Sequence, residues 1–259
     1  MLLADRVVVV SGVGLGLGRR VAVAAAGEGA TVVLAARNPN TLAAVDAEIR
    51  DAGGTSLPVP TDLTDADACT ELVDTVLGRF GRFDGLVNNA FLGPMGDEFL
   101  DADFDWWRRI FEVNVWATLG LTREVALRMR DAGSGSIVFV ASMAARIGMV
   151  GETGYAASKG ALLAATRTLA TELGPAGVRV NAVVPGWMWG PNVEVYCAIE
   201  AHRREISPEA VRDEIAQRIP LGRVPTDEEC AGAVTFMLSD LASAVTGQAL
   251  DVNGGQYYG

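Results

Sequence analysis

Short runs of β-branched and other apolar residues alternate with longer stretches of helical period, and this alternation limits the possible folds more than any other feature. The run from Val7 to Val10 is apolar at four consecutive positions, which is typical of a strand buried on both faces. The longer stretches are rich in Ala, Leu, Arg and Glu. Strands that alternate with helices predict a doubly wound parallel α/β sheet with helices on both faces.

Seven such runs predict a seven-stranded sheet. The predicted strands cover residues 6–11, 31–36, 56–60, 85–88, 136–141, 178–184 and 249–252. The predicted helices cover residues 17–27, 41–52, 65–78, 105–130, 154–173 and 227–238. Thr226 followed by Glu229 matches a capping box, which marks the start of the last of these helices.

The chain of 259 residues contains no internal repeat, charge block or linker that would divide it, so we expect a single domain over residues 1–259. Residues 187–222 depart from the alternation, because no clear strand is visible there and the helical signal is short. Ligands of open α/β sheets bind beyond the carboxyl ends of the strands. We therefore interpret residues 187–222 as an insert that covers the substrate.

Acidic residues outnumber basic ones by 32 to 21, which gives a formal net charge of −11. Binding to nucleic acid or to an anionic membrane needs a basic face, so neither partner is expected. No uncharged run approaches the roughly 20 residues of a membrane-spanning helix, and the N-terminus shows no signal-peptide pattern. The three widely spaced cysteines predict free thiols, no metal site and a cytoplasmic protein.

A glycine-rich turn follows the first predicted strand directly and leads into a helix. Gly12, Gly16 and Gly18 would permit a tight turn, close approach of a pyrophosphate and tight packing of the helix on the strand. The helix N-terminus would add free N–H groups for the phosphates. In this position the turn predicts a dinucleotide site rather than a plain connection. Contacts with the cofactor are expected at Ser11, Gly12, Gly14, Leu15, Gly16 and Leu17.

The end of the second predicted strand bears on the choice of cofactor. Sites for NAD usually carry an acidic residue about 20 positions beyond the glycine turn, but Ala36 stands there and Arg37 follows. A guanidinium suits a 2′-phosphate, so NADP(H) is favoured; NAD(H) is possible if Arg37 stacks on adenine or faces solvent. Asp62 and Leu63 are expected at the adenine edge, where Asp62 could instead cap a helix.

The motifs of the chain, taken in order, resemble those of the short-chain dehydrogenase/reductase family over nearly the whole length. The glycine turn resembles TGxxxGxG with Ser11 in place of Thr, and residues 88–90 resemble NNAG with Phe91 in place of Gly. The other matching positions are Asn114, Ser142, the YxxxK pair Tyr155 and Lys159, and the dipeptide Pro185-Gly186. The resemblance implies a Rossmann fold. It also implies cofactor contacts at Asn89, Ala90, Tyr155, Lys159, Pro185, Gly186 and Met188.

Tyr155 and Lys159 are expected to carry the chemistry. They are four positions apart, so both side chains lie on one face of a helix. The pKa of a tyrosine is near 10, and an adjacent ammonium stabilises its phenolate. Tyr155 could then exchange a proton with an alcohol or carbonyl oxygen while hydride moves to or from the nicotinamide. Lys159 is the one lysine in the chain, beside 20 arginines, which argues against a chance pairing.

The resemblance assigns the remaining catalytic roles. It implies that Lys159 also holds the nicotinamide ribose, that Ser142 hydrogen-bonds the substrate oxygen, and that Asn114 seats a water linking Lys159 to solvent. The family often has a Thr a few residues after Pro-Gly that contacts the carboxamide, and Gly190 stands at that position here.

Bulky side chains around the Pro-Gly motif predict a bulky apolar or aromatic substrate, although aromatic packing within the loop would explain them equally well. The expected substrate contacts are Ser142, Met143, Met149, Trp187, Trp189 and Tyr196. Trp106 and Trp107 are expected in the core or at a subunit interface, since members of the family commonly form homodimers or homotetramers.

The leading hypothesis is an NADP(H)-dependent oxidoreductase that interconverts a small-molecule secondary alcohol and its ketone. A 3-oxoacyl carrier-protein reductase is an alternative, against which the net charge of −11 argues because carrier proteins are acidic. Enoyl reductases of related fold space Tyr and Lys more widely. A non-catalytic NAD(P)-binding sensor or scaffold is a third possibility, and the intact set at positions 114, 142, 155 and 159 argues against it.

Overall fold

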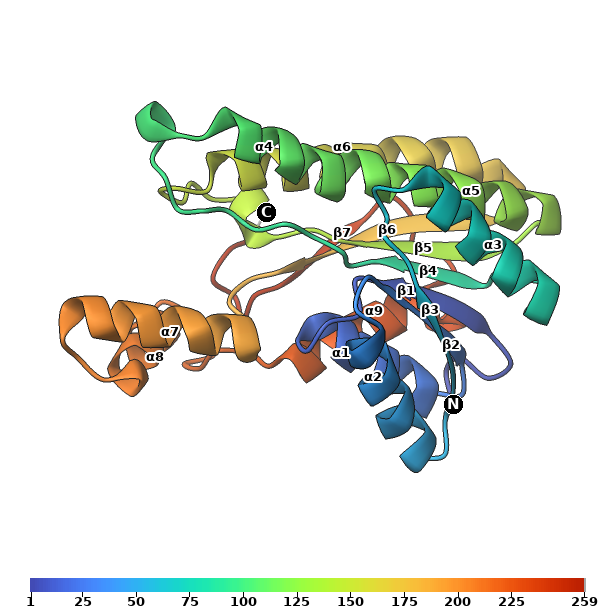
Figure 1. Ribbon diagram of the computed structural model, residues 1–259, viewed down its shortest axis with the longest axis horizontal. Helices are drawn as coiled ribbons and strands as arrows, with labels where there is room; N and C mark the ends of the chain where they lie inside the picture. Colours follow the sequence, from blue (N-terminus) through green and yellow to red (C-terminus); the bar gives the residue numbers. More distant parts are fainter. Residues whose placement is uncertain (259) are drawn as a thin grey trace.

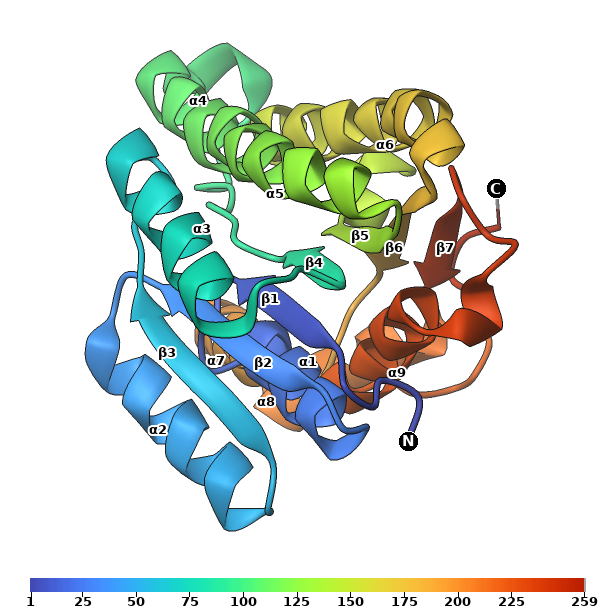
Figure 2. The same ribbon diagram turned by 90° about the vertical axis from the view of Figure 1, so that its right-hand side faces the viewer.

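The computed structural model describes residues 1–258 and confirms a parallel sheet of seven strands in the order β3-β2-β1-β4-β5-β6-β7 (Figures 1 and 2). The strands are β1 Val7–Ser11, β2 Thr31–Ala36, β3 Thr55–Pro60, β4 Gly85–Asn88, β5 Gly135–Val140, β6 Val178–Pro185 and β7 Ala249–Val252. Every neighbouring pair is parallel. The predicted strands agree with these bounds to within one residue at each end.

Helices cover both faces of the sheet (Figure 2). They are α1 Leu17–Gly27, α2 Pro39–Asp51, α3 Ala66–Phe80, α4 Phe104–Phe111, α5 Thr118–Ala132, α6 Thr153–Leu173, α7 Pro191–Arg204, α8 Pro208–Gln217 and α9 Asp227–Leu238. One hydrophobic core joins the sheet to α3, α5 and α6, and a second joins it to α1, α2 and α9. The chain is therefore a three-layered, doubly wound α/β domain, as predicted.

Strand β1 shows why the sequence folds this way. Val7 and Val9 pack into the core on the α3–α5–α6 side, while Val8 and Val10 pack into the core on the other side. Consecutive valines are required because successive side chains of a strand point to opposite faces and both faces are covered. Strand β3, which contains Pro58 and Pro60, lies at the edge of the sheet, where a missing N–H is tolerated.

The predicted helix over residues 105–130 is wrong in one respect, because it is interrupted. Helix α4 runs into a π-helical turn, Glu112–Ala117, before α5 begins. Asn114 lies in this turn, and its side chain bonds to the loop after β4 and to α6. π-helical turns inside helices are frequent at functional sites, and a 3.6-residue hydrophobic period does not reveal them.

Within residues 187–222, the segment interpreted as a substrate-covering insert, α7 and α8 form a helical hairpin. Pro191 and Pro208 stand at the first positions of the two helices, where a missing N–H costs nothing, and Ser207 caps α8. The hairpin has a small core of its own, formed by Cys197, Ala201, Val211, Ile215, Ile219 and Val224. It projects beyond the carboxyl ends of the strands, on the opposite side from α4 (Figure 1).

Candidate active site

A cavity of about 790 Å³ lies at the carboxyl ends of the strands. Its walls come from the glycine turn, the loops after β2, β3, β4, β5 and β6, and helices α4, α6 and α7. Open α/β sheets bind ligands at this edge, where the strand order reverses about β1 and β4. The cavity is therefore the candidate site.

The glycine turn forms one end of the cavity. Gly12 has a φ of +70°, and a Cβ added there would overlap the backbone of Ala90. A Cβ on Gly18 would lie 2.6 Å from Nδ2 of Asn89, which donates a hydrogen bond of 2.8 Å to the Gly12 carbonyl. Both glycines are thus fixed by close approach of the turn to the loop after β4.

The turn fits the diphosphate of a dinucleotide. A Cβ added at Gly14 would meet nothing within 4 Å, so the backbone there is open to a ligand. Helix α1 begins after Gly16 without a side-chain cap, which leaves N–H groups at its start available to phosphate, while that of Arg19 bonds to the Gly16 carbonyl. Gly12, Gly14, Leu15, Gly16 and Leu17, which were predicted as cofactor contacts, all line the cavity. Ser11 does not line it, because this buried side chain accepts a hydrogen bond from the Asn89 backbone N–H.

The loops after β2 and β3 form the adenosine end. Ala36, Arg37 and Asn38 line this end, and Arg37 is exposed with no carboxylate in ion-pairing distance among residues 1–258. Asp62 and Leu63 also line the cavity. Hydrogen bonds from the side chain and backbone of Thr64 hold the pKa of Asp62 below its ordinary value, and Arg37 lowers it further. Asp62 thus lines the cavity, and its carboxylate also stabilises the turn after β3 by accepting hydrogen bonds from Thr64.

Ser142, Tyr155 and Lys159 line the same cavity, and the side chains of Ser142 and Tyr155 share a hydrogen bond. Ser142 follows β5, and Tyr155 and Lys159 lie one turn apart on α6. The Lys159 ammonium donates a hydrogen bond of 2.8 Å to the Val140 carbonyl and lies 5.7 Å from the Tyr155 ring centre. The Phe91 ring packs edge-on against Tyr155 at 6.3 Å.

Burial controls the protonation of both catalytic candidates. It raises the pKa of Tyr155 to about 12, although a side-chain hydrogen bond with Ser142 lowers it. Burial also lowers the pKa of Lys159 from 10.5 to about 7. The sequence led us to expect that Lys159 would lower the pKa of Tyr155. The low dielectric of the site instead disfavours both charged forms, so the neutral phenol is the stable form of Tyr155.

Asn114 is fully buried and does not line the cavity. Its Oδ1 accepts a hydrogen bond of 2.7 Å from the Leu92 N–H, and its Nδ2 donates to the Leu92 carbonyl and to Ser158 Oγ. Ser158 immediately precedes Lys159 on α6. The Asn114 amide therefore ties the π-helical turn, the loop after β4 and α6 together beside the catalytic pair.

The loops after β4 and β6 complete the predicted cofactor contacts. Asn89, Ala90, Pro185, Gly186 and Met188 all line the cavity. Gly190 lines it as well, and a Cβ there would overlap the carboxylate of Asp227. A larger residue at Gly190 would therefore have to displace the Asp227 carboxylate. Burial raises the pKa of Asp227, at the start of α9, to about 6. The sequence reasoning missed Asp227, which carries no motif.

Five predicted substrate contacts lie outside the cavity lining: Met143, Met149, Trp187, Trp189 and Tyr196. Trp187 packs against Tyr196 with ring centres 4.9 Å apart, and Trp187 and Trp189 pack on the small core of the α7–α8 hairpin. The competing explanation, aromatic packing within the loop, holds for these rings. The side chains that line this part of the cavity instead include Phe91, Leu92, Arg109, Val113, Val193 and Val195. The four-residue spacing of Arg109 and Val113, just before Asn114, is the signal that could have located two of them.

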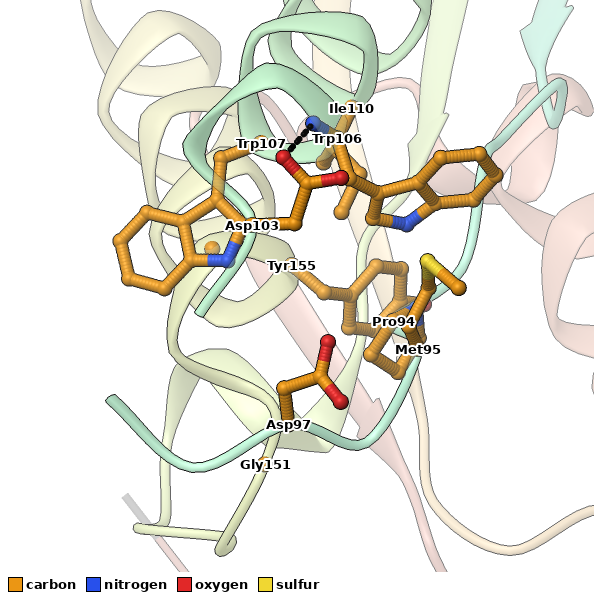
Figure 3. A pocket seen from close by; sticks show the side chains of 10 residues that line it. Pro94, Met95, Asp97, Asp103, Trp106, Trp107, Ile110, Gly151 and Tyr155 are labelled. Carbon is orange, nitrogen blue, oxygen red and sulfur yellow. Dashed lines mark hydrogen bonds between the residues drawn. The ribbon is translucent and has the colours of Figure 1, made fainter. Parts of the chain in front are cut away.

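A small hollow of about 10 Å³ lies beside Tyr155, between α4, α6 and the loop after β4 (Figure 3). Trp106 lines it, and its Nε1 donates a hydrogen bond of 3.1 Å to the Gly93 carbonyl. Trp107 also lines it and lies against Gly154, where a Cβ would clash with the indole ring. Both indoles are thus partly buried and tie α4 to the surroundings of Tyr155.

The remaining expectations concern metals and membranes. His202 is exposed on α7, and no group of three metal-ligating side chains occurs among residues 1–258. Cys69, Cys197 and Cys230 are free and buried. None of the helices in the described part of the chain is long and apolar enough to cross a membrane.

Comparison with known proteins places the chain in a family. A family profile described as "Enoyl-(Acyl carrier protein) reductase" matches residues 12–256. The chain is 37% identical over 258 residues to the short-chain reductase protein NovJ of Streptomyces niveus. This match covers 97% of this chain and 94% of that protein. It is 35% identical over 254 residues to the cis-4-hydroxycyclohexanecarboxylate dehydrogenase of Sinomonas cyclohexanicum, and that match covers 97% of this chain and 96% of the other protein.

A solved structure gives the same result. Actinorhodin polyketide ketoreductase with NADPH superposes with a TM-score of 0.91 at 33% identity, and the match covers 97% of each chain. The motif positions, the fold and these similarities agree. The chain belongs to the short-chain dehydrogenase/reductase family.

Proposed function

We propose that the protein is an NAD(P)-dependent oxidoreductase that interconverts a secondary alcohol and its ketone through Tyr155. The observation that carries the proposal is the meeting of Ser142, Tyr155 and Lys159 in one cavity with the glycine turn. Related proteins are named as reductases and dehydrogenases, and one structural neighbour is described with NADPH. The nicotinamide cofactor supplies or accepts the hydride when bound.

Tyr155 is the proton donor and acceptor at the reacting oxygen. In the direction of reduction, its neutral phenol gives a proton to the carbonyl oxygen, and the high pKa keeps that proton available at pH 7. Ser142, which shares a hydrogen bond with Tyr155, holds the same oxygen. Lys159 has a pKa of about 7, so it can deliver a replacement proton near neutral pH and hold the nicotinamide ribose. Asn114 acts as a positioning residue through Leu92 and Ser158, beside the water that we expect to relay protons to Lys159.

Replacement of Tyr155 tests this role. Tyr155→Phe should reduce kcat on a panel of ketones and secondary alcohols by at least about 100-fold, since general acid–base catalysis contributes about 10²–10⁴. Binding of NADPH, followed by its fluorescence, should stay within a few-fold of wild type. Retained turnover would refute the role of Tyr155. Tight cofactor binding without turnover of any member of the panel by wild type would favour the sensor or scaffold alternative.

Arg37 supports a preference for NADP(H). It lines the adenosine end, and no acidic residue stands at the end of β2 to bind the ribose hydroxyls. An exposed guanidinium without a carboxylate partner is free to bind a 2′-phosphate. Arg37→Gln should raise KM for NADPH by about tenfold or more while KM for NADH changes little. Higher kcat/KM with NADH than with NADPH in wild type would refute the preference.

The α7–α8 hairpin is the proposed cover of the substrate. Val193 and Val195 of α7 line the cavity, and Val195 is 59% exposed to solvent. Closure of an apolar helix over the cavity would exclude water from the reacting centre. Hydrogen exchange of residues 191–204 should slow when cofactor and substrate are both bound. Unchanged exchange would contradict the covering role.

We also propose that the protein forms a homo-oligomer through the α4–α5 side. Phe104 is 52% and Trp116 62% exposed there, and large apolar side chains left exposed to solvent are common at association sites. Light scattering coupled to size exclusion should give a mass of at least two chains, and Trp116→Glu should lower it. A monomer at micromolar concentration would refute the proposal.

A further inference from the structure

Arg109 is an exposed arginine that lines the same cavity as Tyr155. It lies one turn before Val113 on the α4 side, and Val113 also lines this cavity. The apolar side chains that line the cavity with it include Phe91, Leu92, Val113, Val193 and Val195. Such pockets bind the body of a ligand by apolar contact and fix its orientation with a few polar groups.

The guanidinium of Arg109 has no carboxylate partner among the described residues. Thirteen other arginines form ion pairs in this acidic protein, and the adjacent Arg108 pairs with Asp105. Of the seven arginines that form no ion pair among the described residues, Arg37 and Arg109 are the two that line the cavity. The cavity therefore carries two arginines whose charge is left for a ligand.

Trp106 holds the Arg109 guanidinium beside the reacting centre. The Arg109 Cζ atom lies 4.8 Å from the centre of the Trp106 ring, in a cation–π contact. That ring is itself fixed by the hydrogen bond from Nε1 to the Gly93 carbonyl and lines the same small hollow as Tyr155 (Figure 3). Stacking on a fixed ring leaves the N–H edge of the guanidinium free, and that edge matches the two oxygens of a carboxylate or phosphate.

We propose that the substrate carries an anionic group, a carboxylate or a phosphate, which Arg109 binds while the carbonyl lies at Tyr155. The inference rests on the proposed alcohol–ketone activity and narrows its substrate class. A protein with a net charge of −11 repels anions at long range, so an anionic substrate needs a local cation of this kind. Two kinds of substrate carry such a group. One is a small ketone with a carboxylate, and the other is a pantetheine thioester with a phosphate.

Two pairs of ketones that differ in the anion test the proposal. The first pair is 4-oxocyclohexanecarboxylate and its methyl ester, and the second is acetoacetyl-pantetheine 4′-phosphate and acetoacetyl-pantetheine. In wild type, kcat/KM should favour the charged member of at least one pair by about 10- to 100-fold, as expected for hydrogen bonds to a charged group. The pair that shows this preference identifies the source of the anion.

Variants of Arg109 assign the preference to this side chain. Arg109→Gln should bring the ratio of charged to neutral kcat/KM close to one, and Arg109→Lys, which keeps the charge without the planar fork, should fall between. Arg79→Gln is the matched control, because Arg79 is an exposed arginine on α3 that also stacks on an aromatic ring, Phe80, outside the cavity. This control should keep the wild-type ratio.

A binding measurement separates failure of this inference from failure of the proposed activity. Calorimetric titration of 4-oxocyclohexanecarboxylate and of the pantetheine phosphate into the enzyme loaded with NADP⁺ requires no turnover. Weaker binding of either anion to Arg109→Gln than to wild type and Arg79→Gln supports the anion site even if neither ketone is reduced. A ratio near one in wild type for both pairs, or a preference that survives in Arg109→Gln, overturns the inference.

Discussion

Lys159 should destabilise the cofactor-free fold at neutral pH, and its replacement by Met should reveal how much. The shift of the Lys159 pKa from 10.5 to about 7 makes burial of the ammonium cost about 4 kcal/mol at pH 7. Lys159→Met removes this cost. It also leaves the Val140 carbonyl without its donor, a loss of about 1–3 kcal/mol. The variant should therefore be about 1–3 kcal/mol more stable than wild type at pH 7.

The sign of the effect follows from proton binding. Between pH 7 and 10.5 the unfolded chain holds the lysine proton and the folded chain does not, so the stability of wild type rises with pH across this window. By pH 9.5 the cost of burial falls to about 1.4 kcal/mol. The advantage of Lys159→Met should then have shrunk by about 3 kcal/mol, to near zero or below.

Urea unfolding of the cofactor-free proteins at pH 7, 8, 9 and 9.5 measures this difference in free energy of unfolding. Thr166→Val is the control, because Thr166 is also buried on α6 and its hydroxyl donates a hydrogen bond, but it does not titrate. Its effect on stability should be the same at every pH. A difference between Lys159→Met and wild type that stays constant from pH 7 to 9.5 would refute the depressed pKa of Lys159.

Two further substitutions probe the cofactor end. Gly12→Ala should lower the free energy of unfolding by more than about 2 kcal/mol in thermal or urea melts, because Gly12 has a φ of +70° and a Cβ would overlap the Ala90 backbone; a stable variant would contradict that contact. Asp227→Asn should tighten binding of NADPH on the order of tenfold above pH 6, because the Asp227 carboxylate faces the turn at Gly16 and is negative above its pKa of about 6. Wild-type Kd should weaken as pH rises through 6 while that of the variant stays level, and parallel pH profiles would exclude this role.

The sheet and the cofactor end of the cavity were predictable because local patterns determine them. Consecutive valines such as Val7 to Val10 require burial on both faces of a strand, and a φ of +70° at Gly12 requires glycine. These constraints act on single residues or on residues close together in the sequence. The residues that meet them could therefore be named from the sequence.

The substrate end was not predictable in the same way. Trp187 and Trp189 are as apolar as any pocket residue, and only the pairing of α7 with α8 decides that they pack on the hairpin. The π-helical turn at Asn114 is similarly hidden, since it depends on hydrogen bonds from Asn114 to Leu92 and Ser158, both distant in sequence. Contacts between segments that lie far apart determine both features, and no local period records them.

The separate core of the α7–α8 hairpin has a consequence for how such an enzyme diversifies. Cys197, Ala201, Val211 and Ile215 contact one another and not the two cores of the sheet. Substitutions among these four residues should therefore have little effect on the two cores of the sheet. Residues 191–217, which hold the two helices, are therefore the segment to graft between relatives in search of new substrate ranges, whereas Met188 and Gly190 pack on the sheet core and on Asp227 and should be kept.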